Sequence, residues 1–290
     1  MNLANQDNKS KLIVFTDLDG TLLDHDSYQF DEAKPALNRL KALSVPVIPT
    51  TSKTFAEAEV LLKELDLMSP VIVENGGIIA IPPGFKISES EKFFQVGDFK
   101  LLLMSVDYAS IISVLDNLRT QYKFQFRGFN DMGVEELAHA TSLPAQKAAN
   151  AQKRLCSEPL IWLDSKQRLA EFEQLIHQHH LSMTQGGRFW HVMGEVDKSI
   201  AMKKVIQLCL GEQAKLATVI ALGDNPNDVT MLKSADIGVV IRRKDSSCLS
   251  FESENKIYTS DLPGPAGWNA FFMWYLDEYL KDTNNECLRK

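Results

Sequence analysis

Two carboxylates follow an apolar stretch near the start of the chain, where residues 14–24 read VFTDLDGTLLD. Asp17 and Asp19 are two positions apart at the end of an extended segment, so their side chains leave the same face while Leu18 points away. At the carboxyl end of a strand in an open parallel sheet, such groups border the crevice where ligands bind. A solvated turn rich in Asp and Gly is the alternative explanation. The third aspartate, Asp24, lies beyond the loop and is assigned only a structural part.

Two other predicted strand ends carry oxygen-bearing side chains. VPVIPTTS ends in hydroxyls that include Thr51, and ATVIALGDNPND ends in Asp224 and Asp228. Parallel strands would bring these groups to the same edge of a sheet as Asp17 and Asp19. Mg²⁺ prefers a few carboxylates together with waters and substrate phosphate. The sequence therefore predicts a Mg²⁺ site at this edge, and chemistry explains the coincidence better than four separate structural aspartates.

A phosphate dianion at such a site would need a nearby positive charge. Like charges about 4 Å apart repel by roughly 4 kcal/mol at an effective dielectric constant near 20. Lys198, in the stretch GEVDKSIAMKKV, is the best candidate because it stands at the start of a predicted helix, whose free N–H groups also favour an anion. A solvent-facing lysine paired with Asp197 is the alternative.

Apolar β-rich runs alternate with helical patterns in the first part of the chain and again in the last part. This rhythm predicts an α/β fold with a doubly wound, Rossmann-like parallel sheet covered on both faces. Between the two parts the pattern changes to mixed strands and helices, which indicates an inserted α+β cap domain. We predict a core from residues 1–87 and 193–290 and a cap from residues 88–192.

The composition narrows the class of protein. The chain has 290 residues, 44% of them hydrophobic, and a formal net charge of −7 without a dense Lys/Arg stripe, which argues against a nucleic-acid or anionic-membrane partner. Its four cysteines include no C-x-x-C pair and are expected to be reduced thiols in the cytoplasm. No stretch approaches the roughly 18 apolar residues of a membrane span. We expect a cytoplasmic protein with a small-molecule partner.

The motifs, taken in order, resemble those of the haloacid dehalogenase superfamily of phosphatases. They are DLDGT at 17–21, a hydroxyl after the second strand, Lys198, and GDNPND at 223–228, with a large insert between the second and third. The resemblance implies that Asp17 attacks phosphorus and becomes an aspartyl phosphate, while Asp19 acts as the general acid and then the base. It also implies that Mg²⁺ is bound by Asp17, by the backbone carbonyl of Asp19 and by Asp224, and that Asp228 supports the ion directly or through water. Thr51 and Lys198 would hold the transferring phosphoryl oxygens.

Several shorter strings resemble the mannosyl-3-phosphoglycerate phosphatase family within that superfamily. They are TTSKT, ENGG, GGRFWHV, DKS and GPAGW. The chain departs from the family pattern at Thr51-Ser52, where a Ser-Ser pair is usual, and at Ser199, where Gly is usual. Ser199 would crowd a backbone approach to phosphate but adds a hydroxyl that can donate.

The GGRFWHV string supplies the predicted substrate contacts. Gly186 and Gly187 suit a hairpin turn, and alternation places Phe189 and His191 on one face with Arg188 and Trp190 on the other. Arg188 offers a fork for a carboxylate such as that of a glycerate, and His191 a hydrogen bond to a sugar hydroxyl or carboxylate. A hairpin scaffold with a packed Trp190 is the alternative explanation of the string.

The turn ENGG contributes a further predicted substrate contact, Asn75, beside the catalytic edge. We therefore predict Arg188, His191, Asn75 and Gly187 as the substrate-binding residues.

Three other functions are compatible with parts of this pattern. A broader sugar-phosphate phosphatase or a phosphomutase would use the same aspartates. A phosphorylatable signalling module also combines acidic residues, a hydroxyl and a lysine, but it needs neither Asp19 as an acid nor an insert of about a hundred residues. The sequence therefore favours a phosphomonoesterase whose substrate is mannosyl-3-phosphoglycerate, released as mannosylglycerate, or a related phosphorylated sugar.

Overall fold

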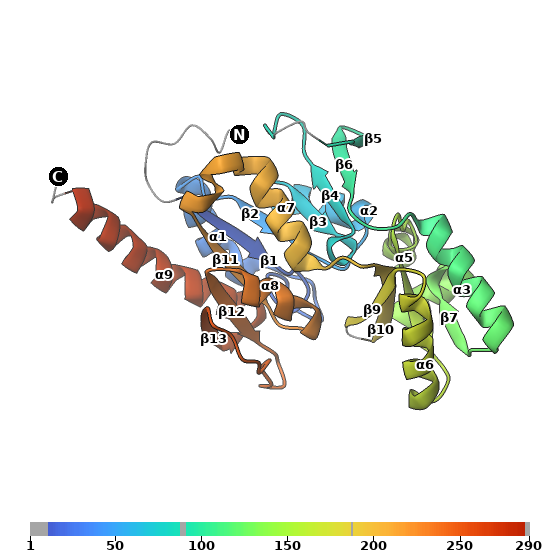
Figure 1. Cartoon of the computed structure of the whole chain (residues 1–290). Coiled ribbons are helices and arrows are strands. Elements are labelled where there is room, and N and C mark those ends of the chain that lie inside the picture. Colours follow the sequence, from blue (N-terminus) through green and yellow to red (C-terminus); the bar gives the residue numbers. More distant parts are fainter. Residues whose placement is uncertain (1–10, 88–90, 187, 288–290) are drawn as a thin grey trace. The chain divides into compact units, whose positions relative to one another are not determined.

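The computed structural model describes residues 11–87, 91–186 and 188–287, which fold into two compact units. We call Thr50–Lys215 the middle unit, and Lys9–Pro49 together with Leu216–Lys290 the terminal unit. Each unit has its own sheets (Figure 1). The α/β class is confirmed, while the predicted limits of core and cap stay a prediction.

The terminal unit contains a five-stranded parallel sheet in the order β13-β12-β11-β1-β2 (Figure 1). Its strands are β1 (Lys11–Thr16), β2 (Val47–Pro49), β11 (Ala217–Gly223), β12 (Ile237–Arg242) and β13 (Lys256–Pro263). Its helices are α1 (Lys34–Ala42), α8 (Val229–Ser234) and α9 (Gly264–Cys287). Ile13, Val14 and Phe15 are at most 1% exposed, which agrees with a strand that is buried on both faces.

The connections of this sheet run in opposite directions from its centre. From β1 the chain crosses through α1 to β2, and from β11 it crosses through α8 to β12 on the other side. Since both crossovers are expected to be right-handed, α1 and α8 cover opposite faces. The crevice at such a reversal lies beyond the carboxyl ends of β1 and β11. Asp17 and Asp224 immediately follow these two strands.

Helix α9 is hydrogen-bonded to the end of β1. It packs on α1, β12 and β13, and its aromatic residues contribute to the core of the terminal unit. Trp268 is fully buried, and its Nε1 donates to Thr16 Oγ1 at 3.1 Å. Thr16 Oγ1 in turn donates to the carbonyl of Asp17 at 2.8 Å. Trp268 therefore packs in the core and also supports the backbone next to Asp17.

The middle unit contains two antiparallel four-stranded sheets, β3-β4-β6-β5 and β7-β8-β10-β9. The strands are β3 (Val71–Val73), β4 (Ile78–Ile81), β5 (Phe94–Val96), β6 (Phe99–Leu103), β7 (Phe126–Gly128), β8 (Ser157–Trp162), β9 (Leu181–Gly186) and β10 (Phe189–Gly194). The α-helices are α2 (Phe55–Glu64), α3 (Tyr108–Tyr122), α4 (Val134–Thr141), α5 (Ala145–Ala151), α6 (Lys166–His177) and α7 (Lys198–Leu210). None of the described helices of either unit has the length and apolar character needed to cross a membrane.

Strand β3 corrects one detail of the predicted fold. The apolar run PVIVE belongs to the alternating pattern from which the parallel sheet is predicted, but Val71–Val73 pairs antiparallel with β4. Among the described residues its parallel pairing is limited to a bridge between Thr50 and Ile72. The reason is the short ENGG turn, which sends the chain directly back as β4. The periodicity of a buried apolar run does not show whether the strand pairs with a parallel or an antiparallel neighbour.

Four helices of the middle unit begin at residues that the sequence already marks as caps. Thr54, Asp107, Ser165 and Asp197 each accept a hydrogen bond from a backbone N–H in the first helical turn, at the starts of α2, α3, α6 and α7. At α2 the bond is part of a capping box, because Glu57 bonds back to the N–H of Thr54 at 2.9 Å. These caps set where the helices begin.

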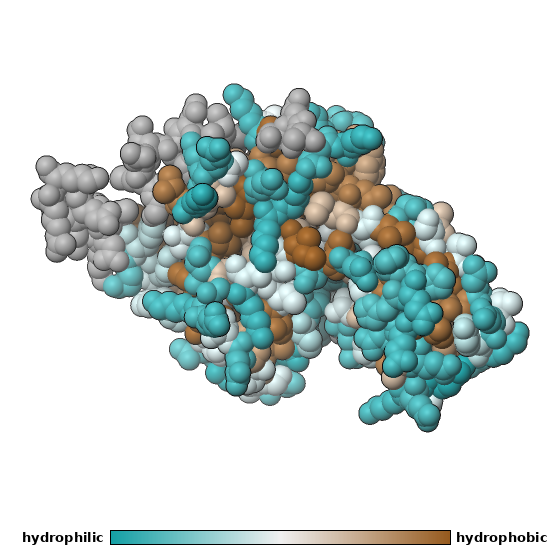
Figure 2. Space-filling model, viewed as in Figure 1, coloured by the Kyte–Doolittle hydropathy of each residue, from teal (hydrophilic) through white to brown (hydrophobic). Residues whose placement is uncertain are grey.

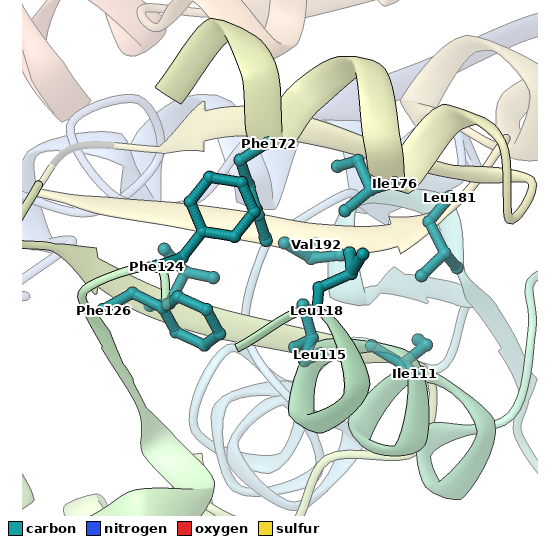
Figure 3. Close-up of a cluster of buried hydrophobic side chains, with 10 residues drawn as sticks. Ile111, Leu115, Leu118, Phe124, Phe126, Phe172, Ile176, Leu181 and Val192 are labelled. Carbon is teal, nitrogen blue, oxygen red and sulfur yellow. The ribbon is translucent and has the colours of Figure 1, made fainter. Parts of the chain in front are cut away.

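An aromatic core holds the second sheet of the middle unit to α3 and α6. Figure 3 shows Phe172 of α6 and Leu115 of α3 pointing toward Phe126 on the sheet. The surface over these two helices is largely hydrophilic in the view of Figure 2. This arrangement agrees with the amphipathic pattern QRLAEFEQLIH of α6.

A carboxylate is buried within this sheet. Glu158 on β8 is 1% exposed, and it accepts hydrogen bonds from Tyr108 Oη at 2.7 Å and from the N–H of Asn130 at 2.8 Å. Burial raises the pKa of Glu158 to about 7, although these bonds and Arg154 favour its charged form. The folded protein therefore holds a proton on Glu158 at pH values where the unfolded chain has lost it.

The first prediction concerns the pH dependence of stability. The pKa of Glu158 is higher in the folded state than the value of about 4.3 in the unfolded chain. Its contribution to stability is therefore present below about pH 4.3 and is lost as the pH rises through 7, by up to about 4 kcal/mol. Glu158→Gln should flatten the fall in the free energy of unfolding between pH 5 and pH 8, measured by urea denaturation. An unchanged pH dependence in the variant would contradict this assignment.

Candidate active site

The backbone delivers Asp17 directly to the end of the parallel sheet. Its N–H donates to the carbonyl of Leu222 on β11 at 2.9 Å, so the ladder between the two strands continues through Asp17. The side chain is 7% exposed. Leu18 is 1% exposed and belongs to the core, whereas Asp19 is partly exposed.

A glycine lets the turn after Asp19 approach Asp224. Gly20 has a φ of +83°, and a Cβ there would lie 2.9 Å from Asp224 Oδ2. Thr21 then donates through Oγ1 to Asp224 Oδ1 at 3.2 Å. The glycine of the DGT string is therefore explained by its backbone conformation, and the threonine by its hydrogen bond to Asp224.

The loop after β11 orients the second pair of carboxylates. Asp228 is fully buried, and its Oδ2 accepts from the N–H groups of Asp224 at 3.1 Å and Asn225 at 3.0 Å. A Cβ at Gly223 would lie 2.4 Å from that of Asp228, so only glycine fits there. The side-chain amide of Asn225 donates to both carboxylate oxygens of Asp224 at 3.0 Å.

Arg243 also supports this loop, and sequence reasoning missed it. Its Nε donates to the carbonyl of Asp224 at 3.0 Å and lies 3.5 Å from Asp224 Oδ2, while Nη2 donates to Asn225 Oδ1 at 2.8 Å. The residue follows β12, in the exposed stretch RRKDSS, where nothing in the pattern distinguishes it from a solvated charge. It lines a pocket of about 630 Å³ in the terminal unit together with Asp224 and Asn225.

Three carboxylates meet at this edge of the sheet. One carboxylate oxygen from each of Asp17, Asp224 and Asp228 lies within 4.8 Å of the other two, and all three residues are buried. A group of hard oxygen donors at this spacing fits Mg²⁺, which neutralises the concentrated negative charge. Three of the four predicted metal residues thus come together through their carboxylates, and Asp19 is the one expected to act through its backbone carbonyl.

Thr51 and Asn75 lie together in the middle unit. Thr51 is 1% exposed, its N–H donates to the carbonyl of Ile72 at 2.9 Å, and its carbonyl accepts from the N–H of Asn75 at 2.9 Å. Asn75 is 2% exposed, with a φ of +56° that asparagine tolerates better than most residues. Thr51 and Asn75 are therefore both buried and are joined by a backbone hydrogen bond.

The ENGG turn also touches the start of α7. Gly76 has a φ of +104°, and a Cβ there would lie 2.3 Å from the carbonyl oxygen of Asp197 and 3.1 Å from the N of Lys198. Lys198, the first residue of α7, is 1% exposed and so is not the solvent-facing lysine of the alternative explanation. The two glycines in ENGG thus serve close packing as well as a turn.

Ser199 has a use within the helix cap. Its Oγ donates to Asp197 Oδ1 at 2.7 Å, and the same oxygen accepts from the N–H of Ile200 at 2.9 Å. The hydroxyl that replaces the usual glycine therefore reinforces the start of α7, where Lys198 stands.

The predicted substrate residues of the hairpin separate into buried and exposed positions. His191 is 5% exposed, and burial, Arg154 and Lys198 lower its pKa to about 3, so its ring is neutral at pH 7. Arg188 is exposed, and its Nη2 donates to the carbonyl of Thr141 at 2.7 Å. Gly187 lies outside the described residues.

The hairpin turn differs by one position from its prediction. Phe189 pairs with Gly186, so β9 continues through the first glycine of the GGRFWHV string. The predicted alternation holds, because Trp190 packs on the aromatic core below α3 and α6 while Phe189 contacts Phe129 on the other face.

A buried acidic residue at the ENGG turn was also missed from the sequence. Glu74 is fully buried, and its carboxylate accepts from the N–H groups of Leu155 at 2.8 Å and Cys156 at 3.1 Å and from Ser157 Oγ at 2.6 Å. Its partners are about 80 positions away in the chain, so no local pattern points to it.

Comparisons with known proteins agree with this geometry. The sequence profile of the haloacid dehalogenase-like hydrolase family matches residues 14–251. A glucosyl-3-phosphoglycerate/mannosyl-3-phosphoglycerate phosphatase of Methanococcoides burtonii is 37% identical, with 91% of this chain and 96% of that protein covered. A phosphatase of the same name from Persephonella marina is 34% identical over 92% of this chain and 98% of that protein. A Thermoplasma acidophilum crystal structure has a similar fold, with a TM-score of 0.62 and 15% identity over 92% of this chain and 98% of that chain.

The second prediction tests the charge repulsion among the three carboxylates. Asp17→Asn should raise the free energy of unfolding in the presence of a chelator by at least about 3 kcal/mol, the repulsion of one pair of these charges, because it removes one of three close negative charges. It should also remove the stabilisation by Mg²⁺, which reaches about 2.7 kcal/mol in the parent protein at 100 times the dissociation constant. Thermal unfolding with and without Mg²⁺ measures both effects. The exposed Asp261→Asn is the control, and an equal Mg²⁺ response in Asp17→Asn would contradict the assignment.

The third prediction tests the contact between the ENGG turn and α7. Gly76→Ala should reduce the free energy of unfolding by about 3 kcal/mol, because a left-handed residue gains a Cβ that also collides with Asp197. Gly84→Ala is the matched control: Gly84 has a φ of +73° and no atom within 4 Å of an added Cβ, so we expect only about 1 kcal/mol. Equal losses in the two variants would show that the close approach is unimportant.

Proposed function

Because this chain belongs to the haloacid dehalogenase-like hydrolase family, we propose that it is a Mg²⁺-dependent phosphatase that converts mannosyl-3-phosphoglycerate to mannosylglycerate. The observation that carries the proposal is the buried group of Asp17, Asp224 and Asp228 at the end of the parallel sheet. The names of the two relatives support the substrate, and they add glucosyl-3-phosphoglycerate as a second candidate.

In the proposed reaction a carboxylate oxygen of Asp17 attacks phosphorus, and the bond between phosphorus and the glycerate oxygen breaks. Asp19 gives its proton to that leaving oxygen. Asp19 then takes a proton from a water molecule that attacks the aspartyl phosphate, which releases inorganic phosphate and restores Asp17. When bound by Asp17, Asp19, Asp224 and Asp228, Mg²⁺ would supply positive charge for the phosphoryl oxygens.

The middle unit supplies the other groups of the proposal. Thr51 and Lys198 would stabilise the phosphoryl oxygens as charge develops on them. Arg188, His191, Asn75 and Gly187 are the proposed contacts to the rest of the substrate. The predicted cap, residues 88–192, would exclude bulk water and select among phosphate esters.

The cytoplasm is the proposed compartment. Cys156, Cys209 and Cys248 are free thiols, which agrees with a reducing environment. No membrane or nucleic-acid partner is proposed, and the expected partner is a small phosphorylated glycoside.

The fourth prediction is a substrate and metal profile. Phosphate release should be fastest with mannosyl-3-phosphoglycerate or its glucosyl analogue, slower with simple hexose phosphates, and abolished by chelation. Asp17→Asn should lose activity, and Asp19→Asn should bind substrate but turn over about 10²–10⁴-fold more slowly.

Asp24→Asn is the matched control for these two variants. Asp24 belongs to the same DLDGTLLD stretch, but its carboxylate accepts from Ser27, from the N–H of Asp26 and from Lys244 in an outer turn. Activity should therefore stay within about twofold. Equal, slow turnover of every ester would overturn the narrow substrate assignment. Phosphate that moves within a hexose phosphate instead of leaving would indicate a phosphomutase.

A further inference from the structure

The proposed reaction gives no role to one buried arginine of the middle unit. Arg154 precedes β8 and is 8% exposed. Its Nε donates to the carbonyl of Ala151 at 3.0 Å, and its Nη1 donates to the carbonyl of Ser52 at 2.9 Å and lies 3.4 Å from Ser157 Oγ. All three acceptors are neutral. Among the described residues, no ion pair includes Arg154, and no hydrogen bond uses its Nη2.

A guanidinium at this depth is costly unless a negative group accompanies it. Two buried carboxylates of the same unit, Glu74 and Glu158, are near enough for charge effects, but their hydrogen bonds come from other groups. Those of Glu158 come from Tyr108 and the N–H of Asn130, and those of Glu74 from the segment 155–157. Glu74 thus holds the segment that follows Arg154 in place, and the guanidinium of Arg154 has no direct hydrogen bond to either carboxylate among the described residues. The bonds to Ala151 and Ser52 hold that guanidinium in one orientation.

A second observation at the same place comes from His191. This residue is 5% exposed, and its Nδ1 is buried without a hydrogen-bond partner in the described part of the chain. The positive charges of Arg154 and Lys198 add to burial in lowering the pKa of His191, so its imidazole is neutral at pH 7. A buried neutral imidazole offers a hydrogen-bonding group to a ligand that binds these cations.

Hydrogen bonds also connect Arg154 and its neighbours to the segment that carries the residues proposed to hold phosphate. Arg154 bonds to Ser52, the residue after Thr51. Thr54 Oγ1 donates to the carbonyl of Asn150, four residues before Arg154, at 2.9 Å. The ENGG turn links Thr51 to Lys198 through Asn75 and Gly76. An anion on Arg154 would therefore accompany an anion on Thr51 and Lys198 in the same ligand.

We propose that Arg154 binds the carboxylate of a ligand that carries both a carboxylate and a phosphate monoester, and that it sets the preference for phosphorylated glycerates over simple sugar phosphates. This inference rests on the proposed function and deepens it. The planar guanidinium matches a carboxylate, and Nη2 is the donor that the fold has left for it. The exposed Arg188, which already donates to Thr141, differs from Arg154 in its burial and its surroundings.

The fifth prediction is tested by binding, without catalysis. Calorimetric titrations compare 3-phosphoglycerate with glycerol 3-phosphate, which lacks the carboxylate, in an Asp17→Asn background that cannot turn the ligands over. We expect 3-phosphoglycerate to bind about 10–100-fold more tightly, as a charge-assisted bidentate bond allows. Adding Arg154→Gln should bring this ratio close to one while the affinity for glycerol 3-phosphate changes by less than about threefold.

Two further variants keep the test decisive. Arg154→Lys keeps the charge but loses the fork, so the ratio should fall partway even if the glutamine variant does not fold. Arg127→Gln removes an exposed arginine of the same unit, paired with Glu136 at 2.6 Å, and should leave the ratio unchanged.

The possible failures are distinguishable. A ratio near one in the Asp17→Asn parent, or equal weakening of both ligands by Arg154→Gln, would overturn the role of Arg154. If the ratio behaves as expected but the natural protein releases no phosphate from mannosyl-3-phosphoglycerate, the carboxylate site stands and the proposed function is wrong.

Discussion

The close approach of three buried carboxylates is the constraint on which the terminal unit depends. Oxygen atoms of Asp17, Asp224 and Asp228 lie within 4.8 Å of one another where two neighbouring parallel strands end. Two charges at such a distance repel by about 3 kcal/mol at an effective dielectric constant near 20. Their arrangement is therefore unfavourable by itself and must be imposed by the surrounding fold.

The neighbouring residues impose it through short, specific contacts. Gly20 and Gly223 remove side chains that would separate the strand ends, and Asn225 and Arg243 bond to the loop that carries Asp224. Trp268 ties α9 to the last residue of β1. A folded scaffold of this kind holds negative groups ready for a cation, so little reorganisation is needed when Mg²⁺ and a phosphate ester bind.

The middle unit shows the opposite balance of charge. Lys198 and Arg154 are buried there, and both charges help to keep the buried His191 neutral. Glu74 is engaged by the backbone of Leu155 and Cys156 and by the hydroxyl of Ser157. This surrounding suits an anionic ligand, whereas the carboxylates of the terminal unit suit a cation. A phosphorylated glycerate meets the first requirement and Mg²⁺ the second, and this supports the proposed substrate class.

The sequence predicts the α/β class and the acidic edge because both follow from local patterns. The DLDGT and GDNPND strings each combine a strand, a turn glycine and carboxylates within a few residues, so their spacing already implies their geometry. Glu74, Arg154 and Arg243 could not be predicted, because their partners are distant in sequence and a single charged residue in a loop has no period. The antiparallel pairing of β3 escaped prediction for a related reason, since an apolar run does not specify its neighbour.

The central claim, that Asp17 is the nucleophile, is tested most directly by trapping its phosphorylated form. The protein is quenched during turnover of mannosyl-3-phosphoglycerate with Mg²⁺, reduced with borohydride, digested and measured by mass spectrometry. An aspartyl phosphate is reduced to homoserine, so we expect homoserine at position 17 and nowhere else. Turnover with an unmodified Asp17, or with the modification at another aspartate, would contradict the account.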